Sequence, residues 1–560
     1  MKSTATAIQL RAPERADFSF LSALRNDPCL QRQLMLALHA HSPTEVRAWI
    51  RRRTRDPHGV FFVVATVSDN RALGFVQLTQ MDPANGTADL GICLGADSRG
   101  KGVAAAALKL LEVRAGRELK LRKMTLRVLT TNRRALAFYR KVGFREVGVL
   151  RRHFLKRTSL ETHMPAAHRV ITDVAQQIWH DDFELSGASL PLNGSTNWAV
   201  RQRRLRGGLS DGVDVVEIDN GALKLELLPT RGMGVWRGNF QGIPIGWDSP
   251  VKMPVHPAFV NQTERGGLGW LAGFNELICR CGLSFMGPPG CDGDLEDHPI
   301  LGELTLHGKI ANLPAHRVEV TVDPDQPGRI AVTGVVDECS MFGPCLRLTS
   351  TIETTIGSNC FTISDEVTNL SAKPAEFEML YHTNIGRPFL EAGSRFLAAA
   401  CEVSPRDARA AEGIDTYDKY AAPDAGYAEQ AYFFRLVGDA RQRGLVVLRN
   451  ASGDLALSLR MSLAELPCFT LWKNTAAEAD GYVTGLEPGT NFPNLRSFER
   501  AHGRVHSLAP GASRQMSFEL AIHPDKTSVQ EVAEEVQSLQ RSTTVAMSWE
   551  PLREYSPAGK

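Results

Sequence analysis

Three ionisable residues, far apart in the chain, have side chains suited to acid–base chemistry. Glu487 stands in "GLEPGTNFPN", His307 in "TLHGK" and His382 in "YHTNIG". A carboxylate and an imidazole with pKa values tuned toward neutrality can remove and return protons without a metal. Each residue also has a plainer interpretation, because a glutamate in a turn is usually solvated and a histidine at a strand end usually packs. Taken singly, they favour the plainer interpretation.

A second group of residues suits anion binding. The segment "RGKGVA" at 99–104 follows a strand-like run and precedes an alanine-rich helical run. Glycines at such a turn let backbone N–H groups converge, and the helix N-terminus adds the positive end of its dipole. The spacing matches neither G-x-x-x-x-G-K-[ST] nor G-x-G-x-x-G. The segment is therefore an anion cradle of another type or an ordinary glycine turn.

Charge is divided unevenly along the chain of 560 residues. Residues 1–160 hold 29 Lys+Arg against 12 Asp+Glu, a balance of +17, which leaves 35 against 50, a balance of −15, out of totals of 64 and 62. The length favours two or three domains, and 43% hydrophobic with 22% charged residues is ordinary globular composition. Two domains with different partners are expected, the basic one binding an anion.

Several classes of protein and site are not expected. No apolar run reaches the roughly 18–20 residues that span a bilayer, and the first residues lack a secretory segment, so we expect a cytoplasmic protein without a membrane partner. No recognised nucleic-acid-binding module is present. Cys279, Cys281 and Cys291 do not complete a four-ligand set, so no metal is expected, and the ten cysteines are expected to be structural or redox-silent thiols.

The first 160 residues alternate between strand and helix signals. Runs at 59–67 and 72–81 predict an antiparallel pair, and "TADLGICLG" predicts a further strand before the glycine segment. "SPTEVRAWIRRR" predicts a helix with Ser42 as its cap and Glu45 closing a capping box. After a strand at 123–130, Asn132 begins a short helix, and Gly143-Phe144 begins another strand.

With R-x-x-G-x-A at 99–104 and N-x-x-A-x-x-F-Y-x-K-x-G-F at 132–144, residues 6–158 resemble the GNAT family of acyl-CoA N-acyltransferases. The resemblance implies an α/β fold, acetyl-CoA as co-substrate and an amine as acceptor. It makes Tyr139 the acid that protonates the leaving thiolate, and the base stays open among Asp89, Glu146 and a water chain. The residues that it implies in cofactor binding are Cys93, Leu94, Arg99, Gly100, Lys101, Gly102, Val103, Ala104 and Asn132.

Beyond residue 160 the pattern changes. Residues 161–194 are expected to be a linker with one short helix at 169–179, "RVITDVAQQIW". From 195 to 525, short alternating runs recur every 8–15 residues or so between turn residues, which predicts one large antiparallel β-sandwich. Residues 526–560 begin as an amphipathic helix and end as a polar tail.

The motifs "TLHGK", "YHTNIG" and "GLEPGTNFPN", in this order, make residues 195–525 similar to the aldose 1-epimerase (galactose mutarotase) superfamily. The segment "LLPTRGMGVWRGNFQGIPIGWDSP" resembles a divergent, poorly characterised branch of it. The resemblance implies a mutarotase-like supersandwich with Glu487 as base, His382 as acid and His307 steadying the sugar oxygens. Candidate substrate-binding residues are Arg231, Trp270, Arg280, Asn384 and Trp472, with Tyr482 as a further stacking residue. The aspartate that binds the 4- and 6-hydroxyls in other members has no clear counterpart, so galactose or glucose specificity is not predicted.

The sequence thus predicts a bifunctional enzyme, an N-acetyltransferase joined to an aldose 1-epimerase-like isomerase. The acceptor could be an amino sugar, a polyamine or a protein N-terminus, and the second ligand is a carbohydrate. Two alternatives stay open: a non-catalytic carbohydrate-binding β domain, or another sugar isomerase on that fold. A homo-oligomer is compatible with the sequence.

Overall fold

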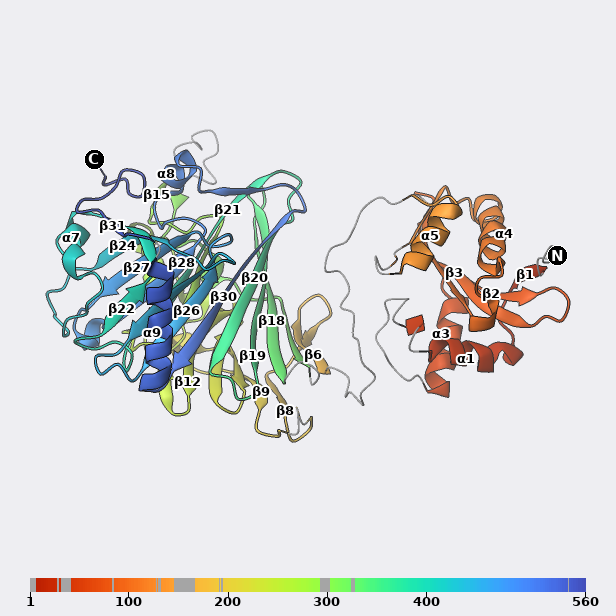
Figure 1. The fold of residues 1–560 in the computed structure, drawn as a ribbon, viewed down its shortest axis with the longest axis horizontal. Coiled ribbons are helices and arrows are strands. Elements are labelled where there is room, and N and C mark those ends of the chain that lie inside the picture. The colour runs from red at the N-terminus through yellow and green to blue at the C-terminus, as the bar shows by residue number, and fades with distance from the viewer. Residues whose placement is uncertain are drawn as a thin grey trace. The chain divides into compact units, whose positions relative to one another are not determined.

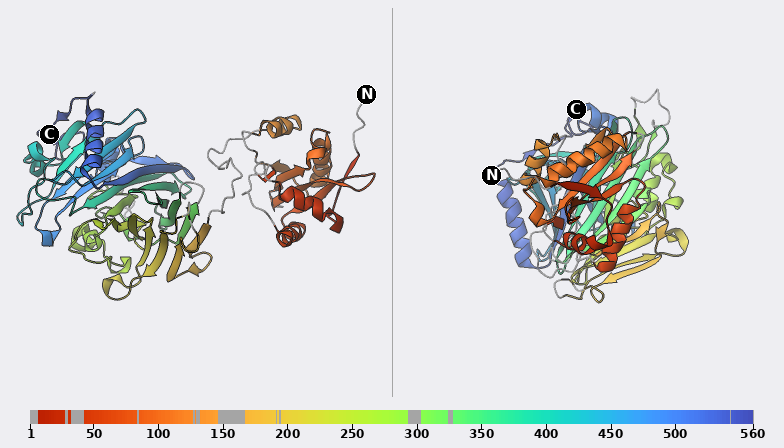
Figure 2. Two further views of the ribbon diagram at one scale, coloured as in Figure 1. Left: turned by 60° about the horizontal axis from the view of Figure 1, so that its bottom comes forward. Right: turned by 90° about the vertical axis from the view of Figure 1, so that its right-hand side faces the viewer.

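The computed structural model describes residues 7–27, 30–31, 42–82, 85–126, 128, 132–145, 167–190, 192, 195–292, 303–323, 328–541 and 543–559. Contacts divide the chain into two compact units, Met1–Glu161 and Thr162–Lys560. Figures 1 and 2 show the first as a small α/β unit and the second as a large β-rich unit.

The first unit is built on one sheet. In its described part, five strands are paired in the order β1-β2-β3-β4-β5, antiparallel except for the parallel pair β4–β5. The elements are β1 (Ile8–Arg11), α1 (Phe18–Arg25), α3 (Pro43–Thr54), β2 (Val60–Thr66), β3 (Ala72–Asp82), β4 (Thr87–Leu94), α4 (Val103–Arg117), β5 (Lys123–Thr125) and α5 (Arg133–Lys141). The predicted capping box of α3 is confirmed, since Ser42 Oγ accepts from Glu45 N at 3.3 Å and Glu45 accepts from Ser42 N at 2.7 Å.

The second unit consists mainly of two large sheets. One has the order β31-β23-β24-β27-β28-β21-β14-β12-β11-β10-β9-β8, with β13 and β29 off this path, and the other β22-β25-β26-β30-β20-β19-β18-β17-β6-β7. The strands of the first sheet are β8 (Asp182–Ser186), β9 (Ala199–Arg204), β10 (Asp214–Asp219), β11 (Leu223–Leu228), β12 (Gly234–Phe240), β13 (Ile243–Ile245), β14 (Ile278–Leu283), β21 (Ala375–Ile385), β23 (Ala400–Pro405), β24 (Gln430–Leu436), β27 (Cys468–Asn474), β28 (Val483–Gly489), β29 (His506–Leu508) and β31 (Ala546–Met547). Those of the second are β6 (Ala167–Asp173), β7 (Ile178–Trp179), β17 (Arg317–Asp323), β18 (Arg329–Cys339), β19 (Cys345–Thr355), β20 (Cys360–Asn369), β22 (Arg395–Ala398), β25 (Arg443–Arg449), β26 (Ala456–Ser462) and β30 (Ser513–His523).

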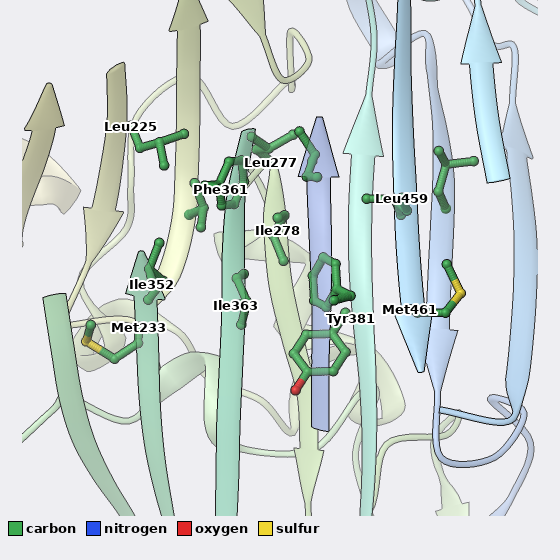
Figure 3. Close-up of a cluster of buried hydrophobic side chains, with 14 of the residues drawn as sticks. Leu225, Met233, Leu277, Ile278, Ile352, Phe361, Ile363, Tyr381, Leu459 and Met461 are labelled. Atoms are coloured by element: carbon green, nitrogen blue, oxygen red, sulfur yellow. The ribbon is translucent and has the colours of Figure 1, made fainter. Parts of the chain in front are cut away.

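The main core lies between these two sheets. Figure 3 shows Ile278 and Tyr381 of the first sheet facing Ile363 and Leu459 of the second, and all four are buried. Alternation along each strand supplies this face, as in β19, where every second residue is buried. The alternating runs of the sequence therefore predicted the sandwich correctly.

The helix expected at 169–179 is wrong. This segment forms β6 and β7, a hairpin at one edge of the second sheet, with β6 paired to β17. Its turn is fixed by Asp173, whose carboxylate accepts from Gln176 N at 3.0 Å, and Gln177 has a φ of 56°. Because β6 to β8 belong to the two sheets, the sandwich begins well before residue 195.

The C-terminal segment completes the unit. The expected helix is present as α9 (Lys526–Gln540), which packs Val529, Val532 and Val536 against a cluster from β25 and β26. Beyond it β31 pairs parallel with β23, and Tyr555 is buried. The tail is therefore part of the domain's packing.

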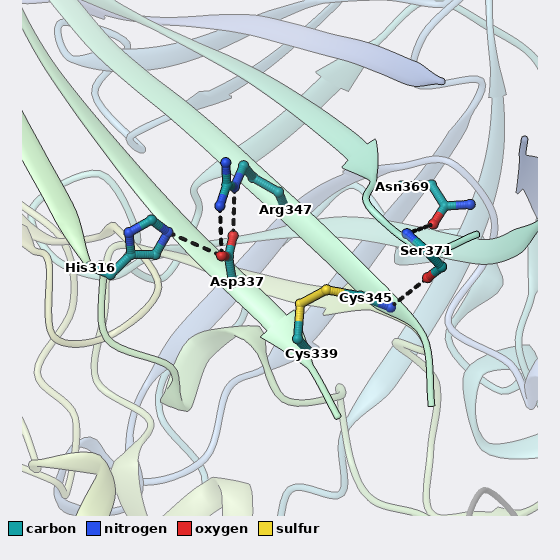
Figure 4. The surroundings of a disulfide bond; sticks show 7 residues. All are labelled: His316, Asp337, Cys339, Cys345, Arg347, Asn369 and Ser371. Carbon is teal, nitrogen blue, oxygen red and sulfur yellow. Dashed lines mark hydrogen bonds and ion pairs between the residues drawn. A yellow bond between two sulfur atoms is a disulfide. The ribbon is translucent and has the colours of Figure 1, made fainter. Parts of the chain in front are cut away.

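One pair of cysteines departs from the expectation of free thiols. Cys339 and Cys345 are register partners at the end of the β18–β19 hairpin and form a disulfide (Figure 4). Two positions from the disulfide, Asp337 and Arg347 form an ion pair of 2.7 Å across the same strands. In the part of the chain that the structure describes, no helix is long and apolar enough to cross a membrane.

Candidate functional site

Neighbouring strands bring the predicted acid–base residues to one face of the first sheet. His382 in β21 is the register partner of Cys279 in β14, and Glu487 in β28 is the partner of Thr470 in β27. The β21–β28 pairing joins Thr383 to Leu486, which places His382 beside Glu487. Successive residues of a strand face opposite sides, and the neighbours Tyr381 and Leu486 belong to the main core, so the side chains of His382 and Glu487 point away from it.

A direct contact joins the acid and base candidates. His382 Nε2 lies 3.2 Å from Glu487 Oε1. On its other side, His382 Nδ1 lies 2.6 Å from Asn384 Oδ1, while Asn384 Nδ2 donates to the carbonyls of Glu276 and His382. These bonds make Oδ1 the acceptor, so Nδ1 of His382 carries the hydrogen. In the neutral ring, Nε2 therefore carries no hydrogen and faces Glu487. There it can accept a hydrogen bond or take up a proton.

A glycine next to the base makes room for its carboxyl group. A Cβ on Gly485, two residues earlier on β28, would lie 2.3 Å from Glu487 Oε1. Gly485 therefore leaves the space that the carboxyl group of Glu487 occupies beside the sheet backbone.

His307 is held by a turn rather than by a strand. Its φ is 57°, its Nδ1 lies 2.9 Å from Met286 O, and its backbone N donates to Gly287 O at 2.9 Å. Gly308 follows with a φ of 73°, and a Cβ there would lie 2.1 Å from Phe285 O. At His307 and Gly308 the backbone therefore passes very close to the backbone of Phe285. Because Met286 O can only accept, His307 also presents Nε2 as its free ring nitrogen.

The three residues line one cavity of about 480 Å³. Its walls are mostly apolar and include aromatic rings: Trp270 lies 4.7 Å from the His307 ring and Trp472 lies 5.2 Å from the His382 ring, measured between centroids. The rings of His307 and His382 are 5.5 Å apart. A cavity of this size with few polar groups is typical of small-molecule sites.

Burial sets the protonation states of the three residues. It lowers the pKa of His307 to about 4 and that of His382 to about 3, because an imidazolium is poorly solvated there. Burial also raises the pKa of Glu487 well above its usual value, and the nearby Glu429 carboxylate raises it further. Burial therefore favours the neutral imidazole of both histidines and the protonated form of the Glu487 carboxyl group, whose Oε1 lies 3.2 Å from His382 Nε2.

The glycine segment of the first unit has the geometry of an anion cradle. Gly100 and Gly102 both have a φ of 79°, and Gly102 is the N-cap of α4 without a side-chain capping bond. The first amide groups of α4, from Val103 on, have no intrahelical acceptor. Arg99 folds back and donates from Nε to Leu94 O at 2.9 Å, which fixes the turn to the end of β4. Lys101 is exposed beside it.

The second motif of the first unit lies nearby. Asn132 caps α5 by accepting from Ala135 N at 3.1 Å, so this side chain has a structural role as well. Tyr139 packs on Phe144, and burial, with Cys93 close by, raises the pKa of its hydroxyl to about 12. Of the base candidates, Asp89 accepts from Thr125 Oγ1, and Glu146 lies outside the described residues.

Comparisons with known proteins separate the two units. The family model "Domain of unknown function (DUF4432)" matches residues 210–522, more than half of the chain. The chain belongs to the DUF4432 family. The model "Acetyltransferase (GNAT) domain" matches residues 8–145, so the first unit is a GNAT domain.

Solved structures are similar to parts of this chain. A protein described as a "putative aldose 1-epimerase" from Klebsiella pneumoniae has 35% identity, covers 68% of this chain and 98% of its own, and gives a TM-score of 0.65. A spermidine N-acetyltransferase from Vibrio cholerae, in complex with CoA and spermine, has 25% identity, covers 27% of this chain and 88% of its own, and gives a TM-score of 0.26. No curated protein matches the chain. The chain is a GNAT domain followed by an aldose 1-epimerase-like DUF4432 domain.

Three expected substrate-binding residues of the DUF4432 domain lie elsewhere. Arg280, one residue from the cavity-side Cys279, points to the opposite face, where it forms a fully buried ion pair with Asp365 of β20. Arg231 is buried against Glu276 at 2.7 Å. Asn384 holds His382, as described above. Strand alternation explains the first error, because neighbouring residues on β14 face opposite sides.

The position of Glu487 is also corrected. Glu487 lies inside β28 rather than in a turn, and only 3% of its surface is exposed. Trp270 and Trp472 do line the cavity, as expected, whereas Tyr482 donates its hydroxyl to Ala421 O and is absent from the described lining.

Three charged residues of the cavity were missed by sequence reasoning: Asp480 just before β28, and the pair Arg406 and Glu429. Arg406 follows β23 and Glu429 precedes β24, and Arg406 Nη2 lies 3.1 Å from Glu429 Oε1. Glu429 Oε2 accepts from Trp472 Nε1 at 2.7 Å, which fixes the indole wall. None of the three residues belongs to a motif. The available signal was weak, a charge directly at the end of a predicted strand.

Proposed function

We propose that the chain is a bifunctional enzyme that transfers an acetyl group to a primary amine in its GNAT domain and interconverts sugar anomers in its DUF4432 domain. The observation that carries the second activity is the 3.2 Å contact between His382 and Glu487 inside an aromatic cavity. We place both activities in the cytoplasm, with a homo-oligomer compatible with them.

One proton on the DUF4432 pair supplies the states that anomer exchange needs once it moves from Glu487, where burial favours it, to His382. When the proton lies on His382 Nε2, Glu487 is a carboxylate that can take the proton of the anomeric hydroxyl, while the imidazolium gives its proton to the ring oxygen. The C1–ring oxygen bond breaks, the aldehyde forms, and rotation about C1–C2 precedes reclosure with the protons returned. Because the two groups are in contact, the sugar must separate them on binding. In this proposal His307 Nε2 binds a sugar oxygen.

The GNAT domain's residues fit a phosphate-bearing cofactor. Gly100 and Gly102 have positive φ, and no side chain caps the N-terminus of α4. Backbone N–H groups are therefore left to bind a pyrophosphate, with Lys101 at the edge. Acetyl-CoA would supply the activated acetyl group there. With a pKa of about 12, Tyr139 keeps its hydroxyl proton at neutral pH and can donate it to a leaving thiolate.

The decisive experiment for the second activity is anomer exchange of free sugars, measured by NMR on the full chain with and without Glu487→Gln. We expect exchange above the buffer rate and a loss of roughly 10²–10⁴-fold in the variant. Glu366→Gln, on β20 of the other sheet, is the matched control and should leave exchange unchanged. Sugar binding without exchange in the wild type would instead support a binding module.

The first activity is tested by acetyl transfer from acetyl-CoA to a panel of amines, including polyamines and amino sugars. Tyr139→Phe removes the hydroxyl group, and with it the proton for the leaving thiolate, while keeping the ring that packs on Phe144. We expect kcat to fall with little change in stability. Transfer to no amine in the panel would refute this part of the proposal.

A further inference from the structure

The cavity of the DUF4432 domain has an unbalanced set of charges. Its charged lining residues outside the acid–base pair are Arg406, Glu429 and Asp480. Arg406 is the cation, and it is already used twice: Nε lies 2.9 Å from Asp407, and Nη2 lies 3.1 Å from Glu429. Among the described residues of the lining, and with the neighbouring Asp407 included, one guanidinium stands against three carboxylates.

Both carboxylates of the cavity lining outside the acid–base pair, Glu429 and Asp480, are exposed. Asp480 is exposed at the end of a short turn before β28, and no ion pair is recorded for it among the described residues. Glu429 is about half exposed, at 49% of its side chain. The two histidines do not offset this charge, because burial keeps both neutral at pH 7. The cavity therefore presents carboxylates to a ligand and no free cation from the described lining.

Aromatic faces accompany these carboxylates. Trp472 is bonded to Glu429, and Trp247 lies beside Gly481, the residue after Asp480, since a Cβ on that glycine would be 2.9 Å from the Trp247 ring. The ring of Phe274 lies 5.1 Å from Trp247 and 6.5 Å from Trp472. Carboxylates combined with indole faces attract cations of the ammonium type, by Coulomb and cation–π attraction. The same arrangement disfavours an anion.

We propose that the ligand of this cavity is an amine-bearing sugar, whose ammonium group is recognised by Glu429 and Asp480 with the indole faces of Trp472 and Trp247. This rests on the proposed epimerase function and narrows it: sugar acids and sugar phosphates are excluded, and neutral sugars are weaker ligands. Arg406 serves to hold Glu429 rather than to bind a ligand carboxylate.

The ligand's charge also bears on the base. A nearby carboxylate raises the pKa of Glu487, and an ammonium group bound beside Glu429 acts in the opposite direction. A cationic sugar therefore favours the ionised form of Glu487 that takes the anomeric proton, which a neutral sugar does not do.

Binding is tested on the full chain without acetyl-CoA by quenching of tryptophan fluorescence, since three tryptophans line the cavity. The probes are D-glucosamine, D-glucose and D-glucuronate at a pH where the amine is protonated. We expect glucosamine to bind about tenfold more tightly than glucose, with glucuronate weakest. Asp480→Asn and Glu429→Gln should each lower this preference several-fold, and Glu366→Gln should not.

The outcomes distinguish the two proposals. Equal binding of glucosamine and glucose, or tightest binding of glucuronate, overturns the amino-sugar proposal whatever the exchange assay gives. Preference for glucosamine without exchange of any sugar upholds it as a binding specificity and refutes the epimerase. Because Glu429 also holds Trp472, the exposed Asp480 is the variant whose effect cannot come from repacking. An unchanged preference in Asp480→Asn counts against the proposal.

Discussion

Replacing Gly485 with alanine should disable the acid–base pair while leaving the fold almost intact. The new Cβ would lie 2.3 Å from Glu487 Oε1, whereas ordinary contacts begin near 3.4 Å, so the carboxyl group must move by about 1 Å. The obstacle is the end of a side chain and not backbone, and Gly485 has no positive φ, so the strand itself can accept alanine. A displacement of about 1 Å in a reacting group can cost on the order of 10²-fold in rate.

The expected result is a fall in kcat for anomer exchange of about 10²-fold, with a change in unfolding temperature of only a few degrees. The assay is NMR exchange spectroscopy on the full chain, beside a thermal unfolding scan. Gly444→Ala, on β25 of the other sheet, is the matched control. Its Cβ would meet the end of the Leu463 side chain at 2.8 Å. It should cost a similar small amount of stability and leave kcat unchanged.

Two results would refute this reasoning. If Gly485→Ala keeps kcat within about twofold of the wild type, the observed place of the Glu487 carboxyl group is not the reactive one. If both variants lose activity equally, the loss comes from general destabilisation of the sandwich rather than from the position of the base.

Three further predictions concern stability. Arg280→Met should lower the free energy of unfolding by about 3–5 kcal/mol, since it leaves Asp365 charged and buried, and should not alter sugar affinity in the surviving folded protein. Burial lowers the pKa of His382 to about 3, below its usual value in the unfolded chain, so the free energy of unfolding should fall as the pH drops below about 6.5. His382→Asn should reduce the slope of this free energy against pH by about 1.4 kcal/mol per pH unit, as measured by urea titrations between about pH 6 and 4. Cys339→Ser opens the disulfide that closes a loop with a sequence separation of 6 and should cost about 2 kcal/mol, an effect that a reductant should reproduce in the wild type and not in the variant.

The sequence predicted the sandwich, and it singled out His307, His382 and Glu487, which the structure brings to one cavity, because strand alternation and short motifs are local signals. It could not supply the side to which Arg280 points. That depends on the register of β14 with β21, where Cys279 pairs with His382 and Arg280 with Tyr381. A one-residue difference decides between a cavity wall and an inter-sheet ion pair.

Other misses have different physical causes. The segment 169–179 has apolar residues at helical spacing, but pairing of β6 with β17 and the turn at Asp173 decide its structure. Glu429 and Arg406 meet in the cavity only because β23 and β24 are neighbours in the sheet. Such non-local neighbours leave no pattern in a single sequence.

The uneven charge of the chain acquires a chemical meaning from the two sites. A basic first part suits a cofactor with several phosphates, and the carboxylates of the second cavity suit an ammonium group. If one amino sugar serves both domains, the order of the reactions follows from its charge. Acetylation converts the ammonium to a neutral amide, which removes the group that Glu429 and Asp480 attract. The free amino sugar is then the ligand of the DUF4432 domain, and its acetylated product should bind that cavity more weakly. A titration with N-acetyl-D-glucosamine measures this directly. Affinity equal to that of D-glucosamine would contradict this order.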